Sequence, residues 1–352
     1  MANARDRFLA LISGRRLGAW PSVQRCGLRL ASLPYGWVVR IRNWLFDWGW
    51  KRSYAVSAPV ISVGNLTLGG TGKTPCVEYV ARFYRQRGLR VAILSRGYGN
   101  LAGCNDEALV LEENLPDVPH LQGADRVTLA NAAIEELESQ VLVLDDGFQH
   151  RRLRRDLDVV LIDATNPWGH GRLFPRGLLR EPRASLRRAD LVVLTRSDQV
   201  SSEQLQKLRA SIGLISAVLP VAETTHQPID LLNSEGLTKP LGDLKEKRVA
   251  AFCGLGNPEA FRQTLLNLEA TVCAFRSFPD HHPYSRSDVE HLGAWARQQA
   301  MDCLVVTTQK DLVKLRLTRL GGRDLFALRI RFQLTAGQEA FDQKLLSIVP
   351  GM

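Results

Sequence analysis

The sequence predicts an α/β fold with a mainly parallel sheet, followed by a second, smaller α/β domain. Apolar-rich runs of strand length alternate with stretches of helical spacing, and this alternation is typical of parallel sheets covered by helices. The runs of the first domain lie at residues 60–63, 90–94, 141–144, 159–162 and 191–194. After a weaker, polar stretch the alternation resumes, which indicates the second unit, with strands expected at residues 249–253, 271–275 and 304–308.

Length and composition fit this organisation. A chain of 352 residues can form two domains with separate cores, and 45% hydrophobic with 23% charged residues is typical of globular proteins. The expected ranges are 1–58 for an amino-terminal segment, 59–222 for the first α/β domain, 223–247 for a linker and 248–352 for the smaller domain.

Cysteine usage and hydropathy indicate the compartment. None of the six cysteines forms a C-x-x-C pair, and their spacing predicts neither a disulfide framework nor a zinc site, which fits a reducing compartment. No secretory signal is recognisable, and no run of 18 apolar residues could span a bilayer. We therefore expect a cytoplasmic protein.

The first 58 residues are basic and rich in tryptophan. They hold ten basic and two acidic residues, which is +8 of the chain's net charge of +10, and five of its seven tryptophans. Residues 28–50 are expected to form an amphipathic helix that begins or breaks near Pro34. Arginine mixed with tryptophan and leucine favours the surface of an anionic membrane over nucleic acid. The remaining alternative is a helix docked on the protein's own core by its tryptophans.

A glycine-rich turn follows the first strand and precedes a helix. Backbone N–H groups in such a turn close on phosphate oxygens, Lys73 reaches the β- and γ-phosphates, and the Thr74 hydroxyl can bind Mg²⁺. Thr67 occupies the position of the first glycine in the strict pattern, so an ordinary glycine turn is the alternative. The candidate nucleotide-binding residues are Thr67, Gly69, Gly70, Thr71, Gly72, Lys73 and Thr74.

A buried strand at residues 141–144 ends in two aspartates, which is typical of the second half of a P-loop nucleotide site. Asp145 or Asp146 would complete the Mg²⁺ shell with Thr74, and the sequence leaves open which aspartate is nearer the metal.

An arginine-rich loop at residues 169–183 suits an anionic substrate, although a solvated basic face is the alternative. A second loop, at residues 95–99, follows the carboxyl end of a strand, where α/β folds bind ligands. The candidate substrate-binding residues are Arg96, Gln149, Arg172, Arg180 and Glu181.

The smaller domain offers fewer motifs. Gly254 and Gly256 begin a dinucleotide-binding pattern, but Glu259 stands at its third glycine position, so NAD binding is rejected. His281 and His282 are adjacent and lack the spacing of a metal site, which leaves an acid–base role or a surface turn.

These motifs together resemble one family, the tetraacyldisaccharide 4′-kinases of lipid A synthesis. The resemblance covers nearly the whole chain. It depends on the segments at residues 63–75, 95–99, 145–150, 180–182, 280–281 and 307–311. The family's loop also lacks the first glycine. The chain departs from the family at three places. Asn100 stands where a basic residue is usual, and Gln309 stands where glutamate is usual. The family's Gly-Asp-Glu-Pro motif reads Asn-Asp-Glu-Ala here, so Asn105 and Ala108 differ.

The resemblance implies a P-loop NTPase domain, a smaller Rossmann-like domain and ATP with Mg²⁺ as cofactors. The implied reaction transfers the γ-phosphate of ATP to the 4′-hydroxyl of a lipid disaccharide 1-phosphate. The residue matching the family's general base is Asp106, which pairs with His281, and we expect the two to meet across the cleft between the domains.

The resemblance also implies an enzyme peripheral to the cytoplasmic face of the inner membrane. We further expect a monomer without nucleic-acid partners. The alternatives are a P-loop switch or metallochaperone-type NTPase and a soluble small-molecule kinase.

Overall fold

The computed structural model describes residues 4–97 and 106–349, which form two compact units. The first comprises the described parts of residues 1–97, 117–225 and 332–352, and the second those of 98–116 and 226–331. Two segments are therefore assigned differently from the sequence-based ranges. Helix α4 (Asp106–Asn114) belongs to the second unit, and helix α10 (Gln338–Leu346) to the first.

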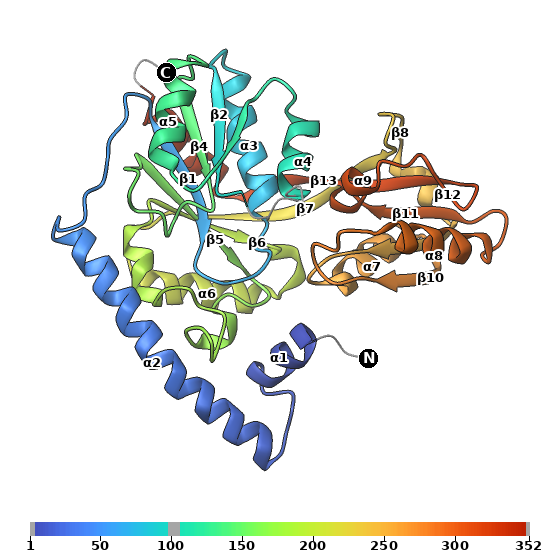
Figure 1. Cartoon of the computed structure of the whole chain (residues 1–352), viewed down its shortest axis with the longest axis horizontal. Coiled ribbons are helices and arrows are strands. Elements are labelled where there is room, and N and C mark those ends of the chain that lie inside the picture. The colour runs from blue at the N-terminus through green and yellow to red at the C-terminus, as the bar shows by residue number, and fades with distance from the viewer. Residues whose placement is uncertain (1–3, 98–105, 350–352) are drawn as a thin grey trace. The chain divides into compact units, whose positions relative to one another are not determined.

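The sheet of the first unit is parallel, as the alternation of strand and helix signals predicts. Its strand order is β7-β6-β5-β1-β4-β2-β3 (Figure 1). The register places Val63 of β1 beside Asp145 of β4. The strands are β1 (Val60–Asn65), β2 (Val91–Ser95), β3 (His120–Gln122), β4 (Val141–Asp145), β5 (Leu157–Asp163), β6 (Leu191–Thr195) and β7 (Val221–Leu232). Every residue of β1, β2, β4 and β6 is buried, which explains their continuous apolar runs.

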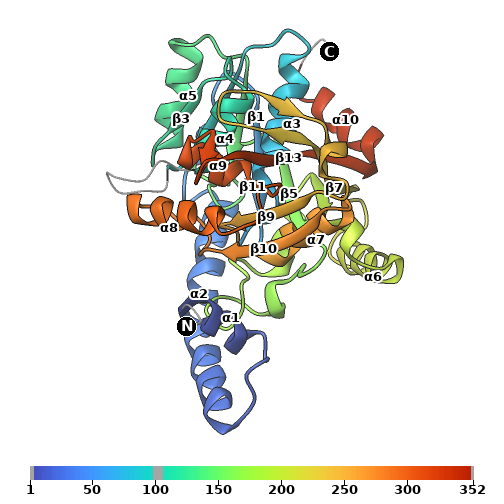
Figure 2. The same cartoon turned by 90° about the vertical axis from the view of Figure 1, so that its right-hand side faces the viewer.

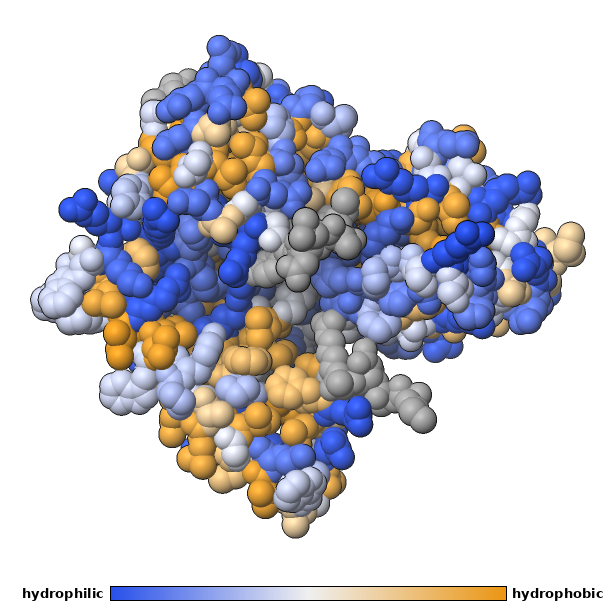
Figure 3. Space-filling model, in the orientation of Figure 1, coloured by the Kyte–Doolittle hydropathy of each residue, from blue (hydrophilic) through white to orange (hydrophobic). Residues whose placement is uncertain are grey.

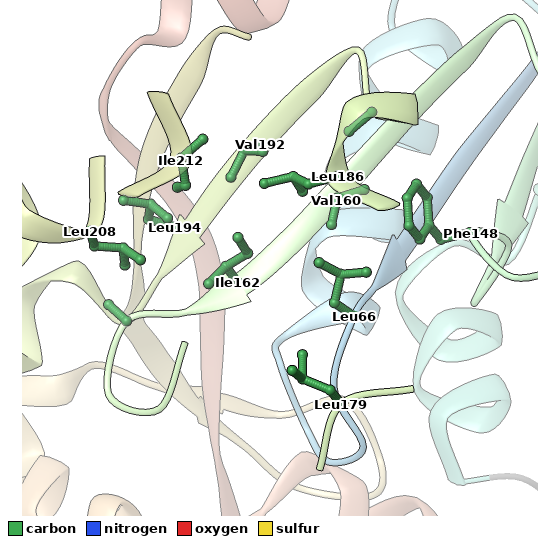
Figure 4. Close-up of a cluster of buried hydrophobic side chains, with 12 residues drawn as sticks. Leu66, Phe148, Val160, Ile162, Leu179, Leu186, Val192, Leu194, Leu208 and Ile212 are labelled. Carbon is green, nitrogen blue, oxygen red and sulfur yellow. The ribbon is translucent and has the colours of Figure 1, made fainter. Parts of the chain in front are cut away.

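Helices and short 3₁₀ turns cover this sheet. In Figure 4, Phe148, which follows β4, lies in a buried cluster with side chains of β5, β6 and α6. Helix α10 packs beside α3 (Figure 2), where the Tyr84 hydroxyl donates to the carbonyl of Leu345 at 2.7 Å. The elements are α3 (Lys73–Arg85), α5 (Arg126–Glu135), η1 (Gly169–Gly171), η2 (Arg183–Arg188), η3 (Ser197–Gln199) and α6 (Ser202–Gly213).

The second unit is a smaller parallel sheet with helices on both faces. Its order is β10-β9-β11-β13. Alternate residues of β9 face opposite sides, so Phe252 packs with Trp295 of α8, whereas Ala251 packs with Phe261 of α7. The elements are η4 (Leu241–Leu244), β9 (Arg248–Cys253), α7 (Pro258–Asn267), β10 (Thr271–Ser277), α8 (Arg286–Arg297), β11 (Leu304–Thr308), α9 (Gln309–Leu315), β12 (Arg319–Leu320) and β13 (Arg323–Ala336).

The region expected to be a polar linker contains a strand. Strand β7 continues to Leu232 and pairs antiparallel with β8 (Thr238–Lys239). Its polar residues include the fully buried Thr224, whose hydroxyl donates to the carbonyl of Leu194 at 3.3 Å. Side-chain hydrogen bonds thus allow a polar sequence to form a strand here. The chain passes between the units within β7 and within β13.

The amino-terminal segment forms α1 (Ala4–Ile12) and a single long helix, α2 (Ala19–Asp47). The expectation that the helix begins or breaks near Pro34 is wrong, because the helix continues through it. A proline inside a helix removes one backbone hydrogen bond. Contacts of α2 with the rest of the first unit hold the helix beyond this point: Tyr35 donates to the carbonyl of Arg180 at 2.9 Å, and Asn43 to Glu181 at 2.7 Å.

Candidate active site

The glycine-rich turn connects β1 to α3. Gly72 caps α3 with φ of 83°, a left-handed conformation that favours glycine, and Lys73 is the first residue of the helix. Thr71 and Thr74 are buried, whereas Gly69 and Gly70 lie in the exposed part of the loop. This strand–loop–helix arrangement directs backbone N–H groups and the positive end of the helix dipole toward one place, as phosphate binding requires.

Thr67 fits the first glycine position because the backbone there is extended. It forms an isolated antiparallel bridge with Leu179, and the next residue, Leu68, donates its N–H to the carbonyl of Leu178 at 2.7 Å. No left-handed conformation is therefore needed at Thr67, and a side chain is tolerated.

Three residues outside the predicted nucleotide-binding set hold the loop. Asn65 donates to the Thr71 hydroxyl at 2.9 Å, Thr195 donates to the carbonyl of Thr71 at 2.9 Å, and Arg196 donates to the carbonyl of Gly70 at 2.9 Å. Asn65 and Thr195 are the last residues of buried strands, and a polar residue at that position is the signal that could have identified them.

Asp146 lies between two cations. Arg180 donates to both of its carboxylate oxygens, at 2.7 and 3.0 Å, and Lys73 Nζ lies 3.6 Å from Oδ1. Burial by itself raises the pKa of Asp146, but the charges of Lys73 and Arg180 and their hydrogen bonds outweigh it and lower the pKa to about 2. The side chain of Asp146 thus stays ionised and holds Lys73 near the loop.

The oxygen ligands that Mg²⁺ prefers are available around this loop. Thr74 follows Lys73, and Asp145 ends β4 beside Val63 of β1. Among the described residues, no group of three or more His, Cys, Asp or Glu side chains could hold a metal by itself. This donor set fits Mg²⁺, which usually binds one or two carboxylates and completes its shell with phosphates and water.

The motifs of β1 and β4 are joined by close packing. A Cβ on Gly64 would lie 2.6 Å from Phe148 Cβ and 2.7 Å from the Phe148 nitrogen, so only glycine fits there. Gln149, the next residue, donates to the carbonyl of Asn65 at 3.0 Å. These contacts fix the Asp145–Asp146 end of β4 against the end of the strand that leads into the glycine loop.

In the second unit, Asp106 and His281 are paired. His281 Nδ1 lies 2.8 and 3.0 Å from the two carboxylate oxygens of Asp106, which is only 4% exposed at the start of α4. The expected contact therefore exists, but both residues belong to the second unit, so the expectation that it joins the two domains is wrong. The residue preceding Asp106, Asn105, and the Tyr98 and Gly99 positions lie outside the described residues.

Two lysines of α9 add positive charge to this pair. Lys314 Nζ lies 3.4 Å from Asp106 Oδ2, and Lys310 forms a 2.7 Å ion pair with Glu107. Burial raises the pKa of Asp106, but the His281 hydrogen bond and the charges of Lys310, His281 and Lys314 lower it to about 2. The hydrogen bond to Asp106 in turn raises the pKa of His281, against the opposing effect of burial.

His282 has different surroundings. Its ring stacks on Phe278 with centroids 4.8 Å apart and packs against Tyr284, and its Nε2 lies 3.1 Å from the Asp288 carboxylate. The histidine thus packs within its own loop and at the start of α8.

A family model described as tetraacyldisaccharide-1-P 4′-kinase matches residues 24–350, which include both sites. The chain belongs to the tetraacyldisaccharide 4′-kinase family. It is therefore a kinase with a hydroxyl acceptor, and the resemblance inferred from the motifs is confirmed.

Relatives and a solved structure agree with this assignment. The tetraacyldisaccharide 4′-kinase of Anaeromyxobacter sp. (strain Fw109-5) is 40% identical over 351 residues, 94% of each chain. That of Syntrophus aciditrophicus is 41% identical over 314 residues, 82% of this chain and 83% of the relative. An LpxK crystal structure from Aquifex aeolicus, in complex with ATP, has a TM-score of 0.74 and 33% identity and covers 93% of this chain and 99% of that one.

The predicted substrate-binding residues of this kinase have unequal environments. Arg180 binds Asp146, and Glu181, 1% exposed, accepts from Asn43 of α2 and from Arg188 at 2.9 Å. Gln149 accepts a hydrogen bond from Arg42 of α2 through its backbone carbonyl. These residues therefore attach α2 to the glycine-loop region. Arg96 and Arg172 are exposed, directly after β2 and after η1 respectively.

Helix α2 exposes most of its apolar residues in one stripe. These residues are three, four or seven positions apart in the sequence, which places them on one side of the helix. The buried residues Gly36, Val39 and Asn43 lie on the other side. Figure 3 shows hydrophobic residues gathered along the lower part of the view, over α2. The exposed stripe comprises Trp20, Val23, Leu30, Leu33, Trp37, Ile41, Trp44 and Trp48. Within residues 4–97 and 106–349, no helix is long and apolar enough to cross a membrane.

Proposed function

We propose that this chain transfers the γ-phosphate of ATP to the 4′-hydroxyl of a tetraacyldisaccharide 1-phosphate in lipid A synthesis. The observation that supports this reaction most directly is the Asp106–His281 pair, in a chain that also has a lysine-containing phosphate loop. A hydroxyl acceptor needs a group that accepts its proton, and a buried, ionised carboxylate beside an imidazole supplies one.

On the nucleotide side, we assign Lys73 and the loop N–H groups to the β- and γ-phosphates. The Lys73–Asp146–Arg180 contacts hold the lysine at the helix start, so less reorganisation is needed when the transferring phosphoryl group develops charge. Thr74 and Asp145 or Asp146 would hold Mg²⁺, which neutralises phosphate charge when bound.

On the acceptor side, we assign Asp106 as the base. In the proposed step the 4′-oxygen forms a bond to the γ-phosphorus. The bond between the γ-phosphorus and the oxygen that bridges to the β-phosphate breaks, and ADP leaves. A carboxylate with a pKa of about 2 is a weak base. Phosphoryl transfer has a loose transition state that asks little of the base beyond orienting the hydroxyl. The hydroxyl proton then passes to the Asp106 carboxylate. When His281 is neutral, its Nδ1 can take that proton over, and its raised pKa favours this transfer.

We also propose that the exposed stripe of α2 lies on the cytoplasmic face of the inner membrane, with the enzyme acting as a monomer. All five amino-terminal tryptophans are at least 45% exposed, so they do not form a buried docking face. The stripe is apolar and the segment carries +8 of the chain's charge, a combination that suits anionic lipid surfaces. Sedimentation velocity of the detergent-free protein would test whether it is a monomer.

The reaction is tested by an acceptor-dependence assay. Purified protein is incubated with ATP, Mg²⁺ and a detergent-dispersed tetraacyldisaccharide 1-phosphate, and both ADP release and the mass of the lipid product are measured. We expect one phosphate added per ADP released, and little ADP without the lipid. ATP hydrolysis independent of lipid would favour an NTPase switch, and transfer to water-soluble sugars alone would favour a small-molecule kinase.

Membrane docking is tested by substitutions on the exposed stripe. Deletion of residues 1–50 would also remove Asn43 from the buried Glu181, so Trp37→Gln/Ile41→Gln is the sharper test. We expect this variant to sediment less with anionic vesicles than the wild-type protein, and added salt to weaken wild-type binding because exposed charges are screened within about 10 Å at 0.1 M salt. Equal sedimentation of the variant and the wild type would contradict the docking proposal.

A further inference from the structure

Helix α9 presents two lysines, one turn apart, to two consecutive acids at the start of α4. Lys310 pairs with Glu107 at 2.7 Å, and Lys314 pairs with Asp106 at 3.4 Å. At the other end of α4, Gln309 donates to Asn114 at 2.8 Å and to Glu113 at 3.2 Å. These polar contacts fix α4, and with it Asp106, against α9.

Lys314 contacts a second carboxylate as well. Its Nζ lies 3.4 Å from Oδ1 of Asp311, which is fully buried. Asp311 is itself held by three hydrogen bonds, from the Thr308 hydroxyl at 2.6 Å, the Tyr284 hydroxyl at 3.0 Å and the Gly254 N–H at 3.0 Å. The ammonium group also lies 5.2 Å from the centre of the Tyr284 ring. Lys314 is therefore anchored at its charged end.

We propose that Lys314 is a positioning residue for phosphoryl transfer, which holds the Asp106 carboxylate ionised and correctly oriented toward His281. His281 Nδ1 contacts both carboxylate oxygens, and Lys314 Nζ contacts Oδ2 as well. A base held by two partners keeps a single orientation, as catalytic groups generally require. This inference rests on the proposed function of Asp106.

The charge of Lys310 also lowers the pKa of both Asp106 and His281, but its ion pair is with Glu107. Its ammonium group is matched by Glu107, whereas Lys314 lies between two carboxylates, Asp106 and Asp311. The remaining charged group at the pair is Asp280, whose carboxylate lies 3.8 Å from His281 Nε2 and raises the pKa of that histidine. Loss of Lys314 would leave Asp106 and Asp311 without the cation between them and raise the proton affinity of the Asp106–His281 pair.

The test compares Lys314→Met with Lys314→Arg, and uses Lys245→Met as the matched control. Lys245 lies in the same unit, and its exposed side chain pairs with Glu269 at 3.0 Å rather than with Asp106 or Asp311. The measurements are kcat and KM for ATP and for the lipid acceptor across pH 5–9. The pKa of His281 is followed by NMR of the labelled imidazole, with His281→Ala for assignment.

We expect Lys314→Met to lower kcat by about 10- to 100-fold, part of the 10²–10⁴-fold contribution typical of a general base. The KM for ATP should not change. The acidic limb of the rate profile should move to higher pH and the pKa of His281 should rise, because loss of a neighbouring cation favours the protonated form of the pair. Lys314→Arg should restore the wild-type pH profile because it keeps the charge, and Lys245→Met should behave as wild type.

A purely structural lysine would lower the melting temperature and leave the pH profile and the histidine titration unchanged, and that result would overturn the inference. If Lys314→Met does not fold, the pair Lys314→Gln/Asp311→Asn, which removes the uncompensated carboxylate, is measured in the same way. A wild-type protein without lipid kinase activity would instead refute the proposed function, whereas the NMR titration would still report whether Lys314 sets the state of the pair.

Discussion

Replacement of Asp106 by alanine separates its proposed role as a base from nucleotide binding. Asp106 is buried, and its contact with His281 at 2.8 Å is already formed in the structure, so no rearrangement is needed to form the pair. A general base contributes about 10²–10⁴-fold to the rate, which corresponds to about 3–5 kcal/mol of activation free energy. Because a pKa of about 2 makes this carboxylate a weak base, we expect a loss near the lower end, about 10²–10³-fold.

The same substitution affects stability. The depression of the Asp106 pKa from 3.8 to about 2 corresponds to about 2 kcal/mol of stabilisation at neutral pH. Asp106→Ala removes this stabilisation and leaves the cations Lys310 and Lys314 without the carboxylate. Rates are therefore measured well below the melting temperature and normalised to folded protein.

The assay measures ADP release and lipid product at saturating ATP, together with ATP·Mg²⁺ affinity by calorimetry. We expect a reduced kcat with nearly unchanged affinity. His281→Ala should cost a similar amount or less, and the double variant should be little worse than the worse single one, because residues that act as a unit are not additive. His282→Ala should reduce the rate less, although its packing on Phe278 predicts some loss of stability.

Two results would refute this reasoning. A folded Asp106→Ala protein with near-normal turnover would exclude the base assignment. Strictly multiplicative losses in the double variant would show that His281 acts independently of Asp106, as a substrate contact or a surface histidine.

The remaining predictions concern the nucleotide side and the pH dependence of the two sites. Lys73→Ala should lower turnover by orders of magnitude in a folded protein, since its charge acts mostly in the transition state; near-normal turnover would falsify the phosphate-loop assignment. Asp145→Asn and Asp146→Asn are compared in a Mg²⁺ titration, and the aspartate nearer the metal should require the higher Mg²⁺ concentration. The pKa of Asp146 is depressed from 3.8 to about 2. The ionised carboxylate therefore stabilises the fold above pH 3.8, and this contribution is lost as the pH falls toward 2. In denaturant titrations, the difference in stability between the wild type and Asp146→Asn should shrink over that pH range. The pKa of His281 is raised above its unfolded value of 6.5. Its contribution to the stability of the fold is therefore complete below pH 6.5 and is lost as the pH rises through the raised folded pKa. His281→Ala should accordingly destabilise the protein less in alkaline buffer.

Local signals in the sequence were sufficient for much of the first unit. The strands at 60–63 and 141–144, the glycine turn before Lys73 and the aspartates that end β4 are short-range patterns. Burial on both faces of a parallel sheet requires continuous apolar runs, and a phosphate loop requires glycine at fixed positions, so sequence and structure correspond directly. The pairing of Asp106 with His281 was expected only from the family resemblance, not from spacing.

Tertiary contacts decided the rest. Asp106 contacts His281, which is 175 positions away in the sequence, and Lys314, which is 208 positions away. These contacts place Asp106 in the second unit and let Lys314 position it. The continuation of α2 through Pro34 accompanies contacts with Arg180 and Glu181, and α10 returns to the first unit, where it packs beside α3. None of these contacts has a local pattern, because each depends on which surfaces remain available to pack once the sheets have formed. The sequence thus determined which groups could do the chemistry, whereas packing between distant segments determined which of them meet.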